Sequence, residues 1–140
     1  MINSVYSRVD QSVLLHQYFH PDPDASNQFT RQNISPENES LQVAYLTLPK
    51  GKTFKAHKHI IYDRNMPMAQ ESWIVLDGEV KVFYYDLDDS LHSTVILTKG
   101  AISVTYRGGH NYLSLTDPAV VYEYKTGPYM GIEYDKVFLK

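Results

Sequence analysis

Three histidines and one glutamate have the types and the spacing of a metal site. His57 and His59 are two residues apart in TFKAHKHII (53–61), a run that predicts a β-strand. Side chains two apart on a strand project from the same face, so both imidazoles should enter the same space. Glu71 opens the next strand-like run, and His110 follows a pair of glycines. Three imidazole nitrogens and one carboxylate oxygen would suit a divalent ion of iron, manganese, nickel, cobalt or zinc.

A divalent ion held in this way keeps a net positive charge and open coordination positions. It could polarise a carbonyl, bind an enediolate, or activate water or dioxygen. Tyr45 and Tyr112 are candidate catalytic residues because a tyrosine near the ion could move a proton. Lys55 lies two residues before His57 on the same predicted face, where it would pair with an anionic substrate. The competing interpretation is that the tyrosines only pack and that the lysine is solvated.

The elements that must position these residues are strands. Short apolar or β-branched runs follow one another from residue 41 onward: 41–48, 53–61, 72–78, 79–86, 93–98, 101–106, 111–115, 119–124 and 136–139. Strands at such spacing, separated by turn residues, predict a sandwich or a barrel. Asp77-Gly78 is the strongest hairpin signal between two runs. No run after residue 41 recurs at three and four residues, so no helix is expected there.

The first forty residues have a different pattern. The run at 12–20 predicts a strand, whereas 21–40 is polar, contains three prolines and predicts a surface connection. We therefore predict an N-terminal extension over residues 1–40, which packs on or pairs with a β-barrel domain over residues 41–140.

Composition excludes several classes of protein. The chain has 140 residues, no cysteine, and a net charge of −3. Disulfide scaffolds, thiolate metal sites and cysteine nucleophiles are excluded. With no excess of basic charge, nucleic acid is not expected as a partner. Neither a membrane-length apolar stretch nor a signal peptide is found, which predicts a cytoplasmic protein without a membrane partner. Twelve tyrosines favour half-buried strands or an aromatic-lined polar pocket.

The spacing of the candidate ligands resembles the first motif of the cupin superfamily. That motif runs Gly, five residues, His, one residue, His, a gap, Glu, six residues, Gly. The matching residues are Gly51, His57, His59, Glu71 and Gly78. The gap holds eleven residues, IIYDRNMPMAQ, and is longer than is usual in the family. Gly100, Gly108 and His110 resemble the second motif, although its acidic residue is replaced by Ala101.

The chain is also similar to small single-domain cupins found with bacterial surface-polysaccharide and sugar-modification genes. The similarity lies in HKHI (57–60), QESWIVLDGEVKVFYYD (70–86), RGGHNY (107–112), and GPYMG with DKV (127–137). This resemblance implies an all-β fold with a single cupin barrel, that is, a double-stranded β-helix or jelly roll. It also implies a divalent metal inside the barrel.

The resemblance implies activity on a small polar molecule, such as a sugar or nucleotide sugar, by isomerase or epimerase chemistry in polysaccharide biosynthesis. A non-catalytic small-ligand-binding cupin or an accessory subunit is an alternative, and an iron-dependent dioxygenase is another. The sequence leaves open whether the protein is an enzyme. A homodimer is expected because the open sheets of such barrels need covering.

Elemental analysis tests the metal prediction. Protein purified without a metal-affinity tag should carry about one divalent ion per chain, because the predicted ligand set is complete. A His57→Ala variant should lose that ion. Absence of metal from both proteins would contradict a four-ligand centre.

Overall fold

The computed structural model describes residues 1–22, 28–55, 57, 59, 68–128 and 131–139. Their strands are β1 (Ile2–Tyr6), β2 (Leu14–Phe19), β3 (Thr30–Asn33), β4 (Ala44–Thr47), β5 (Glu71–Asp77), β6 (Val80–Tyr85), β7 (Leu91–Leu97), β8 (Ile102–Thr105), β9 (Gly109–Ser114) and β10 (Val120–Lys125). One short helix, α1 (Ile132–Asp135), follows them. All strand pairs are antiparallel. The all-β fold class predicted from the sequence is therefore confirmed.

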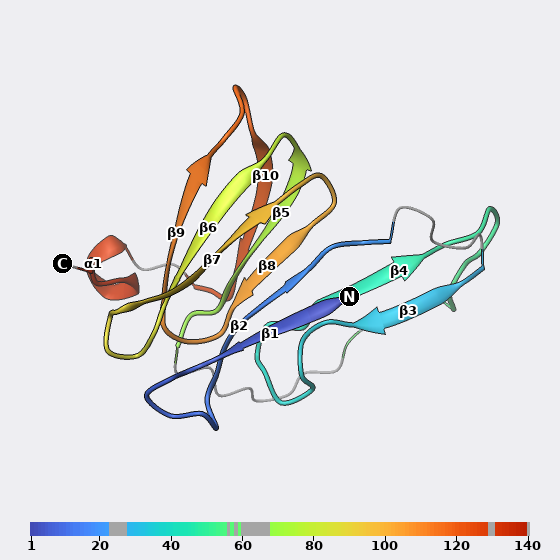
Figure 1. The fold of residues 1–140 in the computed structure, drawn as a ribbon. Coiled ribbons are helices and arrows are strands. Elements are labelled where there is room, and N and C mark those ends of the chain that lie inside the picture. The colour runs from blue at the N-terminus through green and yellow to red at the C-terminus, as the bar shows by residue number, and fades with distance from the viewer. Residues whose placement is uncertain (23–27, 56, 58, 60–67, 129–130, 140) are drawn as a thin grey trace.

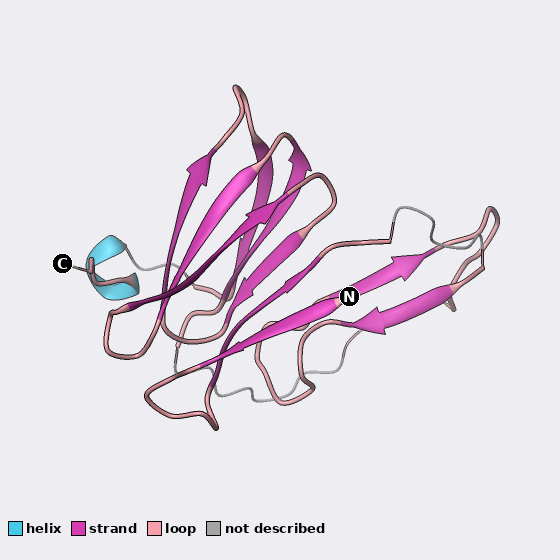
Figure 2. Ribbon diagram, viewed as in Figure 1, coloured by secondary structure: helices cyan, strands magenta, loops and turns pink. Residues whose placement is uncertain are grey.

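The strands form three sheets (Figure 1). A five-stranded sheet has the order β1-β2-β8-β5-β10, and a three-stranded sheet has the order β7-β6-β9. The third sheet is the β3–β4 hairpin, whose turn end extends beyond the other two sheets in Figure 2. No sheet within the described residues closes on itself. The jelly-roll barrel stays a prediction.

A sandwich core lies between the five-stranded and three-stranded sheets. On β6, burial alternates with a period of two, and Val80, Val82 and Tyr84 are the buried members. They pack against Val75 of β5 and Leu97 of β7. Burying one such aliphatic side chain stabilises the fold by about 1.5–3 kcal/mol. The alternating pattern of β6 therefore joins the two sheets.

An outer core lies on the other side of the five-stranded sheet. Ile102 and Val104 of β8 are buried there, together with Phe19 and Ile34. Tyr45 of β4 packs on Phe19, with 5.1 Å between the ring centroids. Because β8 has a core on each side, all four of its residues are buried.

The sandwich core also contains polar side chains, among them Tyr84, Ser103 and His16, which contact one another or Thr105. The Tyr84 hydroxyl and the Ser103 hydroxyl are 2.8 Å apart. His16 is fully buried, stacks on Tyr84 with 4.3 Å between centroids, and lies 3.1 Å from the Thr105 hydroxyl. Burial lowers the pKa of His16 to about 3. The folded protein therefore holds this imidazole neutral.

The hairpin predicted at Asp77-Gly78 is wrong. β5 belongs to the five-stranded sheet and β6 to the three-stranded sheet, so this turn passes between sheets instead of pairing two strands. Gly78 does have a positive φ of 77°, as a tight turn requires. Its backbone, however, lies against Thr116, Pro118 and Ala119. The Asp77-Gly78 pattern thus predicted the turn correctly, but it did not predict which strands pair with β5 and β6.

The strand predicted at 53–61 is also wrong for the residues that the structure describes. Residues 53–55, 57 and 59 lie outside any strand, and 56, 58, 60 and 61 are outside the described residues. A strand needs a hydrogen-bonded neighbour, which the alternating pattern alone does not supply. His57 and His59 therefore do not share the face of a strand.

Smaller differences concern the two ends of the chain. β1 was not expected, and β3 lies within the segment predicted to be a connection. Residues 136–139 form no strand, and α1 stands where no helix was expected. Residues 1–40 supply β1 and β2 to the five-stranded sheet and β3 to the hairpin. No helix in the described chain is long and apolar enough to cross a membrane.

Replacing Gly78 by alanine should destabilise the fold strongly. An added Cβ would lie 2.2 Å from Thr116 Oγ1 and 3.0 Å from the Pro118 carbonyl oxygen. We expect Gly78→Ala to lower the free energy of unfolding by about 3 kcal/mol. Gly51→Ala is the matched control, since Gly51 has a φ of 82° with nothing within 4 Å of its Cβ position. It should cost only about 1 kcal/mol, and equal losses in denaturant unfolding would refute the close approach.

The buried His16 should make stability depend on pH. Its pKa is about 3 when folded and 6.5 when unfolded, so the unfolded chain binds more protons between these values. The free energy of unfolding should therefore fall as the pH falls through this window, by up to about 1.4 kcal/mol per pH unit. Denaturant titrations of His16→Gln between pH 6.5 and pH 4 should give a shallower slope. An unchanged slope in His16→Gln would contradict the assignment.

Candidate functional site

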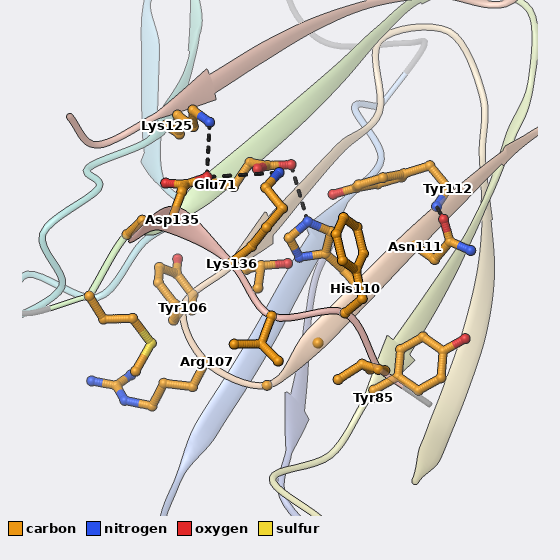
Figure 3. A pocket seen from close by; sticks show the side chains of 18 of the residues that line it. Glu71, Tyr85, Tyr106, Arg107, His110, Asn111, Tyr112, Lys125, Asp135 and Lys136 are labelled. Atoms are coloured by element: carbon orange, nitrogen blue, oxygen red, sulfur yellow. Dashed lines mark hydrogen bonds and ion pairs between the residues drawn. The ribbon is translucent and has the colours of Figure 1, made fainter. Parts of the chain in front are cut away.

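A cavity of about 660 Å³ opens beside the sandwich core. Its wall includes residues of β5, β8, β9 and β10 and the C-terminal residues from Asp135 to Leu139 (Figure 3). This volume is in the range of small-molecule sites in proteins. The described residues that carry charge in this wall are Glu71, Asp89, Arg107, Glu123, Lys125, Asp135 and Lys136.

Glu71 and His110 meet in the wall of this cavity. Glu71 is the first residue of β5 and His110 is the second residue of β9, so the pair joins the two sheets. His110 Nε2 lies 3.2 Å from Glu71 Oε1. Both side chains are mostly buried, with 24% of His110 and 14% of Glu71 exposed. A carboxylate that contacts an imidazole can hold the ring in place and exchange a proton with it.

A second contact between β5 and β9 lies next to this pair. Trp73 and Tyr112 stack with 3.8 Å between ring centroids and 6° between ring planes. Because residues two apart share a face of a strand, Trp73 accompanies Glu71 and Tyr112 accompanies His110. Trp73 Nε1 also donates a hydrogen bond to Glu71 Oε1 at 2.9 Å. The aromatic stack thus fixes the carboxylate as well as the distance between the sheets.

The surroundings of Glu71 favour its ionised form. Burial acts to raise the pKa of this carboxyl, but hydrogen bonding and charge from His110, the Trp73 hydrogen bond and the charge of Lys136 outweigh it. The net effect lowers the pKa of Glu71. Both hydrogen bonds end on Oε1, and no described residue hydrogen-bonds Oε2. Glu71 therefore presents a negative charge with one oxygen available to a ligand.

Two polar atoms near this pair lack hydrogen-bond partners among the described residues. They are His110 Nδ1 and the Tyr112 hydroxyl oxygen, both buried. The Tyr112 hydroxyl faces Ser103 and Thr105 without a hydrogen bond of normal geometry, and burial raises its pKa above the usual range. Buried polar atoms without a partner are uncommon and costly. They leave this end of the sandwich less completely hydrogen-bonded than the rest of the described core.

The cations of the wall are held by neighbouring carboxylates. Arg107 Nη1 lies 2.7 Å from Glu39 Oε1, and Lys125 Nζ lies 3.2 Å from Asp135 Oδ2. Lys136 Nζ is farther from the same Asp135 oxygen, at 3.8 Å. Asp135 is thus shared between two ammonium groups.

The predicted metal ligands form two separate pairs. Glu71 and His110 are together, while His57 lies beside His59 with 5.5 Å between ring centroids. Both of these histidines are exposed and absent from the cavity wall, and His57 Nδ1 lies 3.0 Å from the Lys55 carbonyl oxygen. Across the described residues, no three His, Asp or Glu side chains are grouped to hold a metal ion. The described residues do not assemble the four-ligand centre, which stays a prediction from the sequence.

The three candidate catalytic residues have different surroundings. Tyr112 lines the cavity. Tyr45 belongs to the outer core, and Lys55 is exposed; neither is part of the cavity wall. Of the candidates derived from the sequence, the structure thus brings together Glu71, His110 and Tyr112.

Sequence reasoning missed the cations of the wall. Arg107 and Lys136 fall in RGGHNY and DKV, two segments that carry the cupin resemblance, so a signal was present without a role attached to it. Comparison of the chain with protein-family models, curated proteins and solved structures found no match. The geometry of the cavity therefore carries the functional argument.

Proposed function

We propose that this protein binds a small polar molecule with a carbonyl group, such as a sugar or nucleotide sugar, and moves a proton on it by isomerase or epimerase chemistry. The Glu71–His110 pair in the wall of a cavity of about 660 Å³ is the observation that carries the proposal. A carboxylate in contact with an imidazole is a common arrangement for general acid–base catalysis. The polar and aromatic wall suits a molecule with hydroxyl groups and apolar C–H faces.

The proposed reaction begins at a carbon next to the carbonyl. Glu71 Oε2 takes the proton from this carbon, the C–H electron pair forms a carbon–carbon double bond, and the carbonyl π electrons move to the oxygen. Returning the proton to the neighbouring carbon completes an isomerisation, whereas an epimerisation needs a second proton donor on the opposite face of the same carbon. His110 would move a proton between substrate oxygens. No oxidant or reductant is consumed.

A non-catalytic ligand-binding role is the second candidate. The lowered pKa of Glu71 supports it, because a carboxylate held in the ionised form is a good acceptor for hydroxyl groups but a weaker base. The same cavity would then bind a sugar without changing it. The two candidates differ in whether a carbon–hydrogen bond of the ligand breaks.

Proton exchange with the solvent distinguishes the candidates. We expect proton NMR in D₂O to show deuterium incorporation next to the carbonyl of at least one member of a panel of sugar phosphates, nucleotide sugars and keto acids. Glu71→Gln should slow this exchange about 100-fold or more, because the amide does not accept the proton. Glu79→Gln, at an exposed position outside the cavity wall, should exchange at the wild-type rate.

The other outcomes are equally informative. Binding of a panel member by calorimetry without exchange would overturn the catalytic proposal and support the binding role. Exchange that persists in Glu71→Gln would show that another residue is the base. Neither binding nor exchange with any panel member would overturn both candidates.

A further inference from the structure

The C-terminal segment, residues 132–139, forms one wall of the cavity. It comprises α1 and the residues from Lys136 to Leu139. Asp135 holds it to β10 of the five-stranded sheet through the ion pair with Lys125. Leu139 lies against Gly109 of the three-stranded sheet, where an added Cβ would be 2.7 Å from Leu139 Cδ1. The segment is thus attached to both sheets beside the Glu71–His110 pair.

Lys136 is the residue that this segment directs toward Glu71. Figure 3 shows its side chain pointing toward the Glu71 carboxylate, and its charge contributes to the low pKa of that carboxyl. No ion pair joins the two side chains in the described structure, whereas Asp135 Oδ2 is 3.8 Å from Lys136 Nζ. The lysine side chain is 45% exposed. An ammonium group has three donors, so this one retains donors for a ligand oxygen.

We infer that Lys136 binds the ligand oxygen on which negative charge develops when Glu71 removes the proton. The inference rests on the proposed function and narrows its ligand to a carbonyl sugar bound with that oxygen between Lys136 and Glu71. Removal of the proton neutralises Glu71 and transfers its negative charge to the ligand oxygen. A cation fixed beside that oxygen stabilises the enediolate more than it stabilises the neutral ketone.

The electron and proton movements balance around this residue. The proton passes from carbon to Glu71, the C–H pair becomes the carbon–carbon double bond, and the carbonyl π pair becomes a lone pair on oxygen. Lys136 keeps its proton and donates a hydrogen bond to the oxygen throughout. Return of the proton from Glu71 to carbon restores the carbonyl group. The attachment of residues 132–139 to both sheets keeps the lysine in place during these steps.

The test compares two replacements of Lys136 in the full-length chain with a control lysine. Lys136→Met removes the charge but retains the apolar stem, whereas Lys136→Arg retains the charge. With the panel member that exchanges fastest, Lys136→Met should lower kcat about 100-fold and change KM little. Lys136→Arg should recover at least a tenth of the wild-type kcat. Lys99→Met, at an exposed turn outside the cavity wall, should behave as wild type.

The outcomes separate this inference from the proposed function. Wild-type exchange in Lys136→Met, together with lost exchange in Glu71→Gln, would overturn the role of Lys136 and leave the base in place. A raised KM with unchanged kcat in Lys136→Met would show binding of the ground state only, and would also overturn it. If the wild type exchanges no panel member, the proposed reaction and the role of Lys136 both fail. Circular dichroism of each variant should match the wild type. If Lys136→Met does not fold, Lys136→Arg provides the test: a kcat of at least a tenth of the wild-type value supports the role of Lys136, and a lower value overturns it.

Discussion

Two contacts between β5 and β9 determine the geometry of the candidate site. Glu71 meets His110, and Trp73 stacks on Tyr112, so each sheet supplies one member of each contact. A mostly buried carboxylate is costly unless donors surround it, and here an imidazole and an indole supply them. The contacts hold the two sheets at a fixed distance at this end of the sandwich. The cavity is the space that remains between the sheets and the C-terminal segment.

The position of β8 explains why the interior next to this site is polar. One side of β8 puts Ile102 and Val104 into the outer core, while Ser103 and Thr105 face the sandwich core. A hydroxyl group in a core needs a partner, and Tyr84 and His16 provide it. This polar core helps to explain the abundance of tyrosine, because a tyrosine ring packs in the core while its hydroxyl group hydrogen-bonds a neighbouring side chain. Both readings of the tyrosine content, half-buried strands and an aromatic-lined pocket, are present in one structure.

Local sequence pattern predicted the strands better than it predicted their neighbours. Alternation located β5 and β6, and it placed Glu71 and Trp73 on one face. It did not predict that Gly78 carries the chain from one sheet to the other, because the contacts at Gly78 come from residues about forty positions later. Pairing between distant segments depends on packing, which a window of ten residues does not contain.

Because local sequence pattern does not show which distant segments meet, it identified some residues of the candidate site and missed others. Glu71 and His110 were identified by residue type and by their place at the start of strands. His57 and His59 were assigned to the same site because a strand was assumed between them, and no described strand exists there. Lys136 was not identified because no neighbouring residue in the sequence indicates that residues 132–139 line the same cavity as the first residue of β5. Only the fold brings this lysine and Glu71 together.

The arrangement of charge around Glu71 connects the two candidate functions. His110, Trp73 and Lys136 all stabilise the carboxylate, which weakens it as a base. A ligand oxygen bound by Lys136 would take up part of that stabilisation and would displace water from the carboxylate. Both changes raise the basicity of Glu71 when the ligand is in place. Glu71 is therefore a weak base in the free protein and a stronger base in the complex, because Lys136 then interacts with the substrate oxygen instead of with the carboxylate.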